Sequence, residues 1–163
     1  MIRKNNMEEI LRFIKERNIP MVKKHIGKAD RQAVDSYGDS AVHLAVLEES
    51  HDILHLLIQN GFPVNLRNEE GKTPLHFCAE YNLLNLAEMI LNAGGDLSIQ
   101  DNYGNQPLWT AVFNVKGRLT HLALVRRFLV AGADRDHKNH AGMTPILFAK
   151  RVGYLPLVSL LEN

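Results

Sequence analysis

Apolar residues recur along the chain in pairs of short clusters, and each cluster has the spacing of one helix face. The second cluster of the first pair contains Ile53, Leu54, Leu57 and Ile58. Positions i, i+1, i+4 and i+5 lie on one side of an α-helix, so this pattern predicts an amphipathic helix. The corresponding clusters further along the chain are Leu86, Ala87, Ile90 and Leu91; Leu124, Val125, Phe128 and Leu129; and Leu157, Val158 and Leu161.

A glycine, a polar residue and a first apolar cluster precede each of these helices. In "GKTPLHFCAE", which begins at Gly71, Thr73 provides a hydroxyl for an N-cap and Pro74 occupies the first helical position. The segments that begin at Gly38, Gly104 and Gly142 have the same arrangement. Their apolar positions are Val42, Leu44 and Ala45; Leu75, Phe77 and Cys78; Leu108, Ala111 and Val112; and Ile146, Phe148 and Ala149.

The glycines define a repeat. The first two intervals are 33 residues each, and the third, from Gly104 to Gly142, is 38. Three of the second helices are followed by a further glycine, at positions 61, 94 and 132, where a left-handed C-terminal cap is expected. A fixed period of this size is typical of stacked supersecondary units, here a turn, a helix, a second turn and a second helix.

The period and the Thr-Pro-Leu-His motif resemble those of the ankyrin repeat. The segment "GKTPLHFCAEYNLLNLAEMILNAGGDLSIQDNYG" resembles one complete repeat, and the resemblance covers residues 35–163. It implies an all-α fold, an ankyrin-repeat solenoid of stacked helix–turn–helix units with β-turn fingers. We expect a single domain, 1–163, divided into an N-terminal helical cap (1–34), repeat 1 (35–67), repeat 2 (68–100), repeat 3 with an insertion at 115–119 (101–138), and a truncated repeat 4 (139–163).

Some units depart from the repeat motif. Gln106 replaces the capping threonine of the third unit, and Trp109 replaces its histidine. Residues 1–34 lack the motif but contain two amphipathic segments, with Pro20 at the start of the second. We interpret them as a degenerate repeat with a polar outer face, which a solenoid needs at its end.

Charge is distributed unevenly along the chain, although the net charge is only +1. Residues 1–34 carry a net charge of +5, residues 35–100 carry −8 and residues 101–163 carry +4. An acidic middle between basic ends favours a partner with a basic surface. The alternative is chance clustering on a solvated surface.

The single cysteine excludes an intramolecular disulfide and suits a reducing compartment. No apolar run has the length of a signal peptide or of a membrane-spanning helix. We therefore expect a cytoplasmic protein.

No catalytic pattern stands out among the chemically capable residues. His51 and His55 lie four apart, as in helical zinc sites, but no third ligand accompanies them. Cys78 occupies a slot held by alanine in the other units, so we expect it to be a buried structural residue. The resemblance gives His43 and His76 a structural role in ordering the turn. We expect no enzymatic activity, no cofactor and no bound metal.

In the ankyrin family the turn tips and the first helices line a concave face that binds proteins. Carried over position by position, the predicted partner-binding residues are Tyr37, Asp39, Glu48, Glu69, Glu70, Lys72, Glu80, Tyr81, Asn102, Tyr103, Asn105, Phe113, Lys116, Arg118 and Arg151. Lys116 and Arg118 belong to the insertion, and we expect them to contact an acidic patch at the rim of the partner.

The predicted face combines aromatic side chains with carboxylates. Aromatic residues are enriched at the centres of protein interfaces, whereas carboxylates repel phosphates. This favours a protein partner with a basic contact surface over nucleic acid, with the chain itself a monomer and no membrane partner. A chain made of repeats acts by covering a surface of a partner, which favours an inhibitor or immunity-type protein. A generic cytosolic adaptor that docks a protein or peptide is the alternative.

Overall fold

A computed structural model describes residues 2–162, and the side chains of residues 9–162. Met1 and Asn163, the ends of the predicted domain, lie outside the described residues. The α-helices are α1 (Ile2–Lys15), α2 (Ile19–His25), α3 (Ala41–Leu47), α4 (His51–Gln59), α5 (Pro74–Tyr81), α6 (Leu84–Asn92), α7 (Pro107–Asn114), α8 (Leu122–Val130), α9 (Pro145–Val152) and α10 (Leu155–Glu162). Two 3₁₀ helices, η1 (Ile26–Lys28) and η2 (Leu119–His121), complete the helical elements of residues 2–162.

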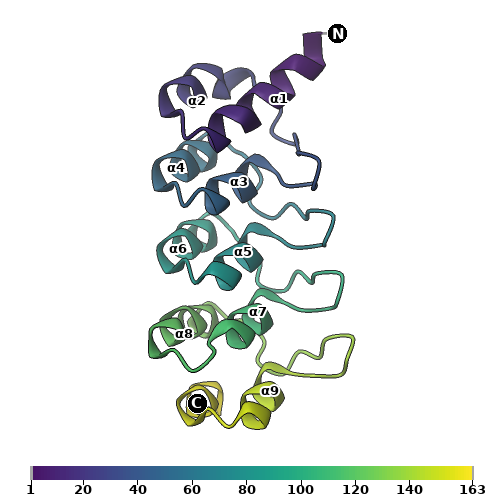
Figure 1. Cartoon of the computed structure of the whole chain (residues 1–163), viewed down its shortest axis with the longest axis vertical. Helices are drawn as coiled ribbons and strands as arrows, with labels where there is room; N and C mark the ends of the chain where they lie inside the picture. The colour runs from purple at the N-terminus through teal and green to yellow at the C-terminus, as the bar shows by residue number, and fades with distance from the viewer. Residues whose placement is uncertain (1, 163) are drawn as a thin grey trace.

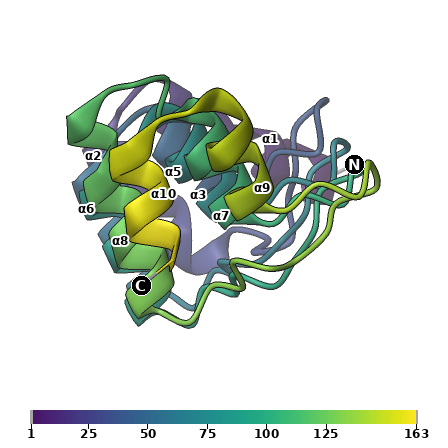
Figure 2. The ribbon, with the colours of Figure 1, turned by 90° about the horizontal axis from the view of Figure 1, so that it is seen from below.

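The helices form antiparallel pairs that stack along one axis (Figure 1). The second helices, from α2 to α10, make one column, the first helices, from α1 to α9, make a second, and the connecting loops project from the first helices as fingers. Seen from below the stack, the fingers extend to one side of both helix columns (Figure 2). Within residues 2–162 the isolated bridge between Val34 and Ser40 is the only β pairing, so the prediction of an all-α solenoid is confirmed.

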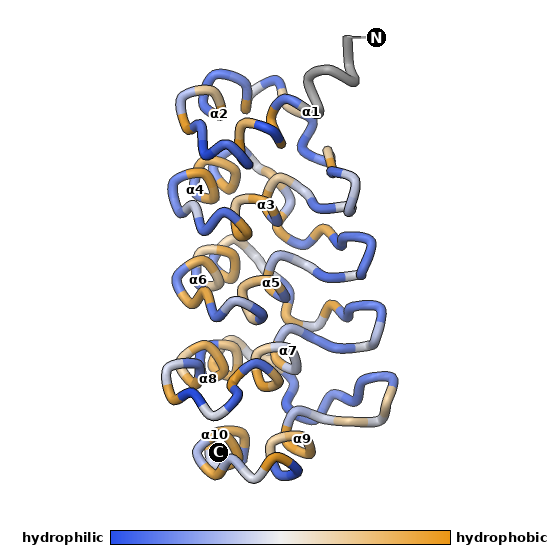
Figure 3. Tube along the Cα trace, viewed as in Figure 1, coloured by the Kyte–Doolittle hydropathy of each residue, from blue (hydrophilic) through white to orange (hydrophobic). Residues whose placement is uncertain are grey.

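The apolar core runs through the whole stack, between the two helix columns (Figure 3). The helix faces predicted from the spacing are the buried ones: Ile53, Leu86 and Leu124 have 0–1% of their surface exposed. In α9, Ile146 and Phe148 are only half-buried, because no further helix pair covers this helix within residues 2–162. Burial of large apolar side chains is the main stabilising contribution to such a core.

The fingers are held by a side chain that recurs once per unit. The carboxylate of Asp35 accepts hydrogen bonds from the backbone N–H groups of Tyr37 and Asp39, at 2.9 and 3.0 Å. Asn68, Asp101 and Asn139 make the same pair of bonds in the next three fingers. Such side chains mimic a backbone turn, so each finger keeps its shape without a partner strand.

Neighbouring fingers are also joined to each other through the backbone. The Glu69 N–H donates to the Tyr37 carbonyl oxygen, the Asn102 N–H to that of Glu70, and the His140 N–H to that of Tyr103. The glycine of each finger has a positive φ, between 71° and 77°. The fingers therefore form a connected ladder beside the first helices rather than independent loops.

Candidate protein-binding surface

A cavity of about 830 Å³ lies between the fingers of the second, third and fourth units and the first helices of the second and third units. Its finger side contains Tyr103 and His140, and its helix side contains Trp109, Phe113 and Glu80. We call the side of the stack formed by the fingers and the first helices the concave face, and this cavity the finger groove. Its size is within the range of ligand-binding clefts, and it is open to a protein segment.

Large aromatic side chains are exposed on the concave face. The exposed fractions are 68% for Tyr37, 53% for Tyr81, 70% for Tyr103 and 50% for Phe113. Tyr37 and Tyr103 occupy the same position in fingers two units apart. Exposed aromatic rings of this size bury a large apolar area when a partner covers them. They are the residues that most often anchor protein interfaces.

Phe113 belongs to an aromatic cluster that joins the third and fourth units. Its ring centroid lies 5.9 Å from that of Trp109 and 5.5 Å from that of Phe148, and Trp109 and Phe148 are 4.8 Å apart. Trp109 occupies the slot that His43 and His76 fill in the first two units. The indole therefore replaces a hydrogen-bonding residue with a large apolar surface at the base of the finger groove.

The carboxylates of the concave face are partly neutralised within the protein. Lys72 Nζ lies 2.8 Å from Glu70 Oε2 and 3.0 Å from Glu80 Oε2. Burial lowers the pKa of Lys72, but the two carboxylates outweigh burial, and the pKa stays above its ordinary value. Glu48 pairs with Arg17, which lies in the turn between α1 and α2. Glu69 is exposed and makes no ion pair among the described side chains, so its charge is the most available to a partner.

Asp39 does not contribute to the accessible surface, contrary to its place in the predicted set. Only 6% of its surface is exposed, and its Oδ1 accepts a hydrogen bond of 2.9 Å from Asn68 Nδ2. Burial raises the pKa of Asp39, although the bond from Asn68 opposes this effect. The side chain links two fingers, which is why it faces inward.

The predicted insertion is part core and part loop. Val115 is completely buried, whereas Lys116 and Arg118 are exposed. Lys116 and Gly117 both have positive φ, at 45° and 76°, and form a tight reversal before η2. The whole segment 115–119 is therefore not a dispensable loop, because its first residue packs against the apolar core.

The finger groove brings together six of the predicted residues and leaves the others elsewhere. The six are Lys72, Glu80, Tyr103, Asn105, Phe113 and Lys116. The predicted residues outside its lining are Tyr37, Asp39, Glu48, Glu69, Glu70, Tyr81, Asn102, Arg118 and Arg151. Sequence reasoning did not place Trp109 or Thr110 in the binding surface, although a tryptophan in a histidine slot was a usable signal.

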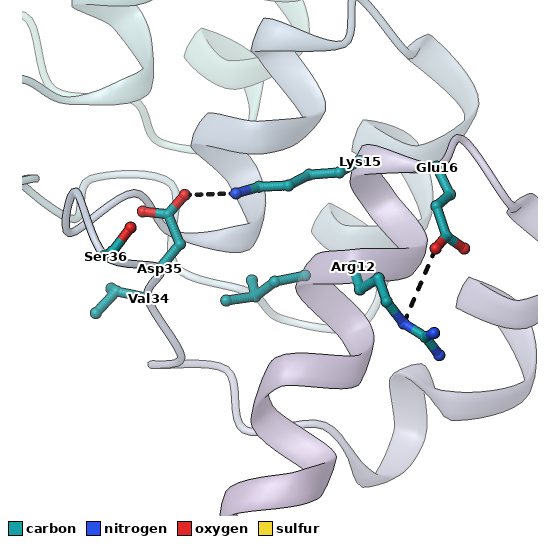
Figure 4. Close-up of a pocket in the computed structure, with 7 residues that line it drawn as sticks. Arg12, Lys15, Glu16, Val34, Asp35 and Ser36 are labelled. Atoms are coloured by element: carbon teal, nitrogen blue, oxygen red, sulfur yellow. Dashed lines mark hydrogen bonds and ion pairs between the residues drawn. The ribbon is translucent and has the colours of Figure 1, made fainter.

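A second cavity, of about 390 Å³, lies where the N-terminal helices meet the first finger (Figure 4). Lys15 Nζ donates a hydrogen bond of 2.8 Å to Asp35 Oδ2 across this cavity. Burial raises the pKa of Asp35, but the bonds from Lys15 and from two backbone N–H groups outweigh burial and lower it overall. The ion pair fixes α1 against the same carboxylate that shapes the finger, so we assign these side chains to docking of the cap.

The residues considered for chemistry occupy structural or solvent-exposed positions. Cys78 is fully buried as a free thiol, and burial raises its pKa. His51 and His55 are exposed on α4. Among the described side chains, no group of three or more His, Cys, Asp or Glu residues is arranged to hold a metal ion. Over residues 2–162, every helix is too short or too polar to cross a membrane.

Comparisons with known proteins agree with this architecture. The family described as "Ankyrin repeats (3 copies)" matches residues 10–101, beginning inside α1. Human ankyrin repeat domain-containing protein 63 is 32% identical over 110 residues, which is 68% of this chain and 29% of that protein. The mouse B-cell lymphoma 3 protein homolog is 30% identical over 138 residues, 82% of this chain and 30% of the relative. Mouse neurogenic locus notch homolog protein 1 is 34% identical over 120 residues, 71% of this chain and 5% of the relative.

The fold and the finger ladder define a stacked helical repeat protein with a protein-binding face. The chain belongs to the ankyrin-repeat family, and its repeats form a protein–protein interaction module. It spans less than a third of the length of each of these three relatives.

Proposed function

We propose that this protein is a non-enzymatic binding module that occupies a basic surface of a partner protein through its concave face. The observation that carries the proposal is the set of exposed aromatic side chains, Tyr37, Tyr81, Tyr103 and Phe113, along the fingers and the first helices. Each of them has about half or more of its surface open to solvent, and none is needed to fill the core.

The preference for a basic partner rests on the distribution of charge. Residues 35–100 carry a net charge of −8, and Glu69 is exposed on the second finger. The pairs between Lys72 and its two glutamates leave one net negative charge in that group. Complementary charge accelerates association and selects among partners more than it adds to final affinity.

We further propose that the module acts as an inhibitor or immunity-type protein, because a face that covers a basic surface can block a site that handles phosphates. A cytosolic adaptor that docks a protein or peptide is the second candidate. The buried free thiol of Cys78 supports a cytoplasmic location, and we propose a monomer in the absence of the partner.

Alanine substitution on two faces tests the binding surface. The partner is identified by affinity capture and mass spectrometry, produced separately, and titrated calorimetrically against the wild type and two double variants. We expect Tyr81→Ala with Tyr103→Ala to weaken binding about 30-fold or more, as for anchors of an interface. Val130→Ala with Leu155→Ala is the matched control, because these side chains are 78% and 75% exposed on second helices. Equal affinity of the tyrosine variant and the wild type would refute the proposal.

A charge reversal tests the basic partner separately. Glu69→Lys should slow association without changing stability, because Glu69 has no ion pair to lose among the described side chains. Asp52→Lys makes the same change of charge on α4, away from the fingers. If the two variants associate at the same rate and both match the wild type, the partner surface is not basic.

A further inference from the structure

An apolar pocket of about 460 Å³ lies beside the finger groove, between α7 and the turn that joins α9 to α10. Its walls are formed mainly by Phe113, Val115, Phe148, Val152 and Tyr154. Phe113 and Lys116 also line the finger groove, so the two cavities share an edge. A segment that lies in the groove has direct access to this pocket.

The reversal at Lys116 and Gly117 forms one wall of the pocket. In the first two units a shorter turn joins the helices, with one positive φ at Glu49 and at Asn82, whereas the third unit has five extra residues, since the interval from Gly104 to Gly142 is 38 residues rather than 33. The turn between α9 and α10, where Gly153 has a φ of 68°, forms another wall of the pocket. The pocket is therefore particular to the junction of the third and fourth units and is not a feature that recurs in every repeat of this chain.

Tyr154 lines the pocket and carries a hydroxyl with an unmet hydrogen-bonding requirement. The hydroxyl oxygen of Tyr154 is buried and has no hydrogen-bond partner among the described residues. A buried hydroxyl without a partner costs free energy. Because this oxygen is buried, Tyr154 lines the pocket through its other atoms, so the pocket wall is apolar there.

The charges around the pocket are positive. Lys116 lines it, Arg118 follows the reversal and Arg151 directly precedes Val152. All three side chains are exposed, and none makes an ion pair or hydrogen bond with another described residue. No acidic residue is among those that line the pocket. This is the reverse of the first two units, whose net charge is negative.

We infer that the pocket binds a large apolar side chain of an acidic segment in a partner protein. The inference rests on the proposed binding function and adds a second, oppositely charged contact to it. A partner that satisfies both contacts carries a basic surface for the first two units and an acidic segment with an apolar anchor for the last two. Burying the anchor supplies apolar contact, and the three cations select the acidic flanks.

Peptides of defined chemistry test the pocket without the natural partner. Trp109 is the only tryptophan, and it contacts Phe113 and Phe148 at the pocket wall, so its fluorescence reports binding of tryptophan-free peptides. The first peptide has a central Leu-Phe pair flanked by glutamates, the second replaces the glutamates by lysines, and the third replaces Leu-Phe by Ser-Ser. We expect the first to bind at least about ten-fold tighter than either of the others and to weaken as salt rises. Equal affinity of the first and second peptides would overturn the inference.

Two variants of α9 locate the binding. Val152→Glu places a carboxylate at the pocket, whereas Leu147→Glu makes the same change at a side chain of similar exposure on α9 that does not line it. We expect only Val152→Glu to abolish peptide binding. If both variants bind the acidic peptide as the wild type does, the pocket is not the site.

Sedimentation of the free protein checks the other occupant: a dimer that Val152→Glu dissociates would assign the pocket to a second copy and contradict the inference. The peptide assay tests the pocket, whereas the tyrosine variants test the concave face. Either proposal can therefore fail without the other.

Discussion

His76 and Asn105 lie 29 residues apart in the chain, yet the imidazole Nε2 of His76 is 3.0 Å from the carbonyl oxygen of Asn105. The other ring nitrogen, Nδ1, accepts a hydrogen bond of 3.0 Å from the backbone N–H of Thr73. One neutral ring therefore caps its own helix and joins its unit to the next finger. His43 makes the corresponding bonds to Ser40 and Lys72 one unit earlier.

Replacing His76 by alanine should destabilise the protein by about 2–3 kcal/mol, because it leaves a buried N–H and a carbonyl without their partner. Urea unfolding monitored by circular dichroism measures the change. His55→Ala, on the exposed face of α4, is the control and should change the free energy of unfolding by less than about 0.5 kcal/mol. Equal effects of the two substitutions would mean that the bonds of His76 do not stabilise the stack.

The same histidines predict that stability falls in mild acid. Burial lowers the pKa of His43 from 6.5 to about 4, even though its bond to the Lys72 carbonyl opposes this, and burial also lowers the pKa of His76. Between pH 6.5 and 4 the unfolded chain therefore binds protons that the folded protein excludes, so stability is full above pH 6.5 and declines towards pH 4. His43 alone accounts for roughly 3 kcal/mol over this range.

Urea titrations at several pH values between 7.5 and 4.5 measure this decline. His43→Gln removes one titrating group and should give a flatter dependence than the wild type. A free energy of unfolding that is constant from pH 7 to 5 would contradict the assignment of neutral, buried rings.

Cys78 should be inert to thiol reagents in the folded protein. Its side chain is fully buried, and burial raises the pKa of the thiol, so neither access nor the reactive thiolate is available. Labelling with a chromogenic disulfide should be complete in about 6 M guanidinium and slower by about 100-fold or more in buffer, since it requires opening of the stack. Rapid labelling of the native protein would show that α5 is not packed as described.

Two finger glycines provide a matched pair for testing the ladder. Gly71 and Gly142 have φ values of 75° and 71°, so alanine is strained at both positions by about 1–2 kcal/mol. A methyl group at Gly71 would lie 2.8 Å from the backbone nitrogen of Asn102 and 2.5 Å from its side-chain oxygen, whereas nothing lies within 4 Å at Gly142. Gly71→Ala should therefore cost at least about 1 kcal/mol more than Gly142→Ala in urea unfolding. Equal costs would show that the fingers are not in close contact.

The periodicity of the sequence predicted the fold well, because each unit repeats the same turn glycines and the same spacing of apolar residues. The buried faces of α4, α6 and α8 follow directly from apolar residues at helical spacing, as at Ile53 and Leu86. The repeat also predicted the positive φ of Gly61, Gly94 and Gly132 at the helix ends. These features depend only on residues that are close in sequence or in the adjacent unit, and the repeat determines both.

The accessible surface was harder to predict, because it depends on hydrogen bonds between units. Asp39 has a position equivalent to that of Lys72, which is only partly buried, but the bond from Asn68 draws Asp39 inward. Val115 belongs to the predicted insertion, yet it packs in the core. The pairing of Glu70 and Glu80 with one lysine depends on side-chain positions that no spacing rule specifies.

Amide hydrogen exchange of the protein, alone and bound to its purified partner, tests the central claim most directly, namely that binding uses the concave face. We predict slower exchange on binding in the fingers around Tyr37, Glu69 and Tyr103 and in the exposed turns that follow α5 and α7, with no change in α4, α6 and α8. Protection confined to the second helices, with the fingers exchanging as in the free protein, would contradict the account.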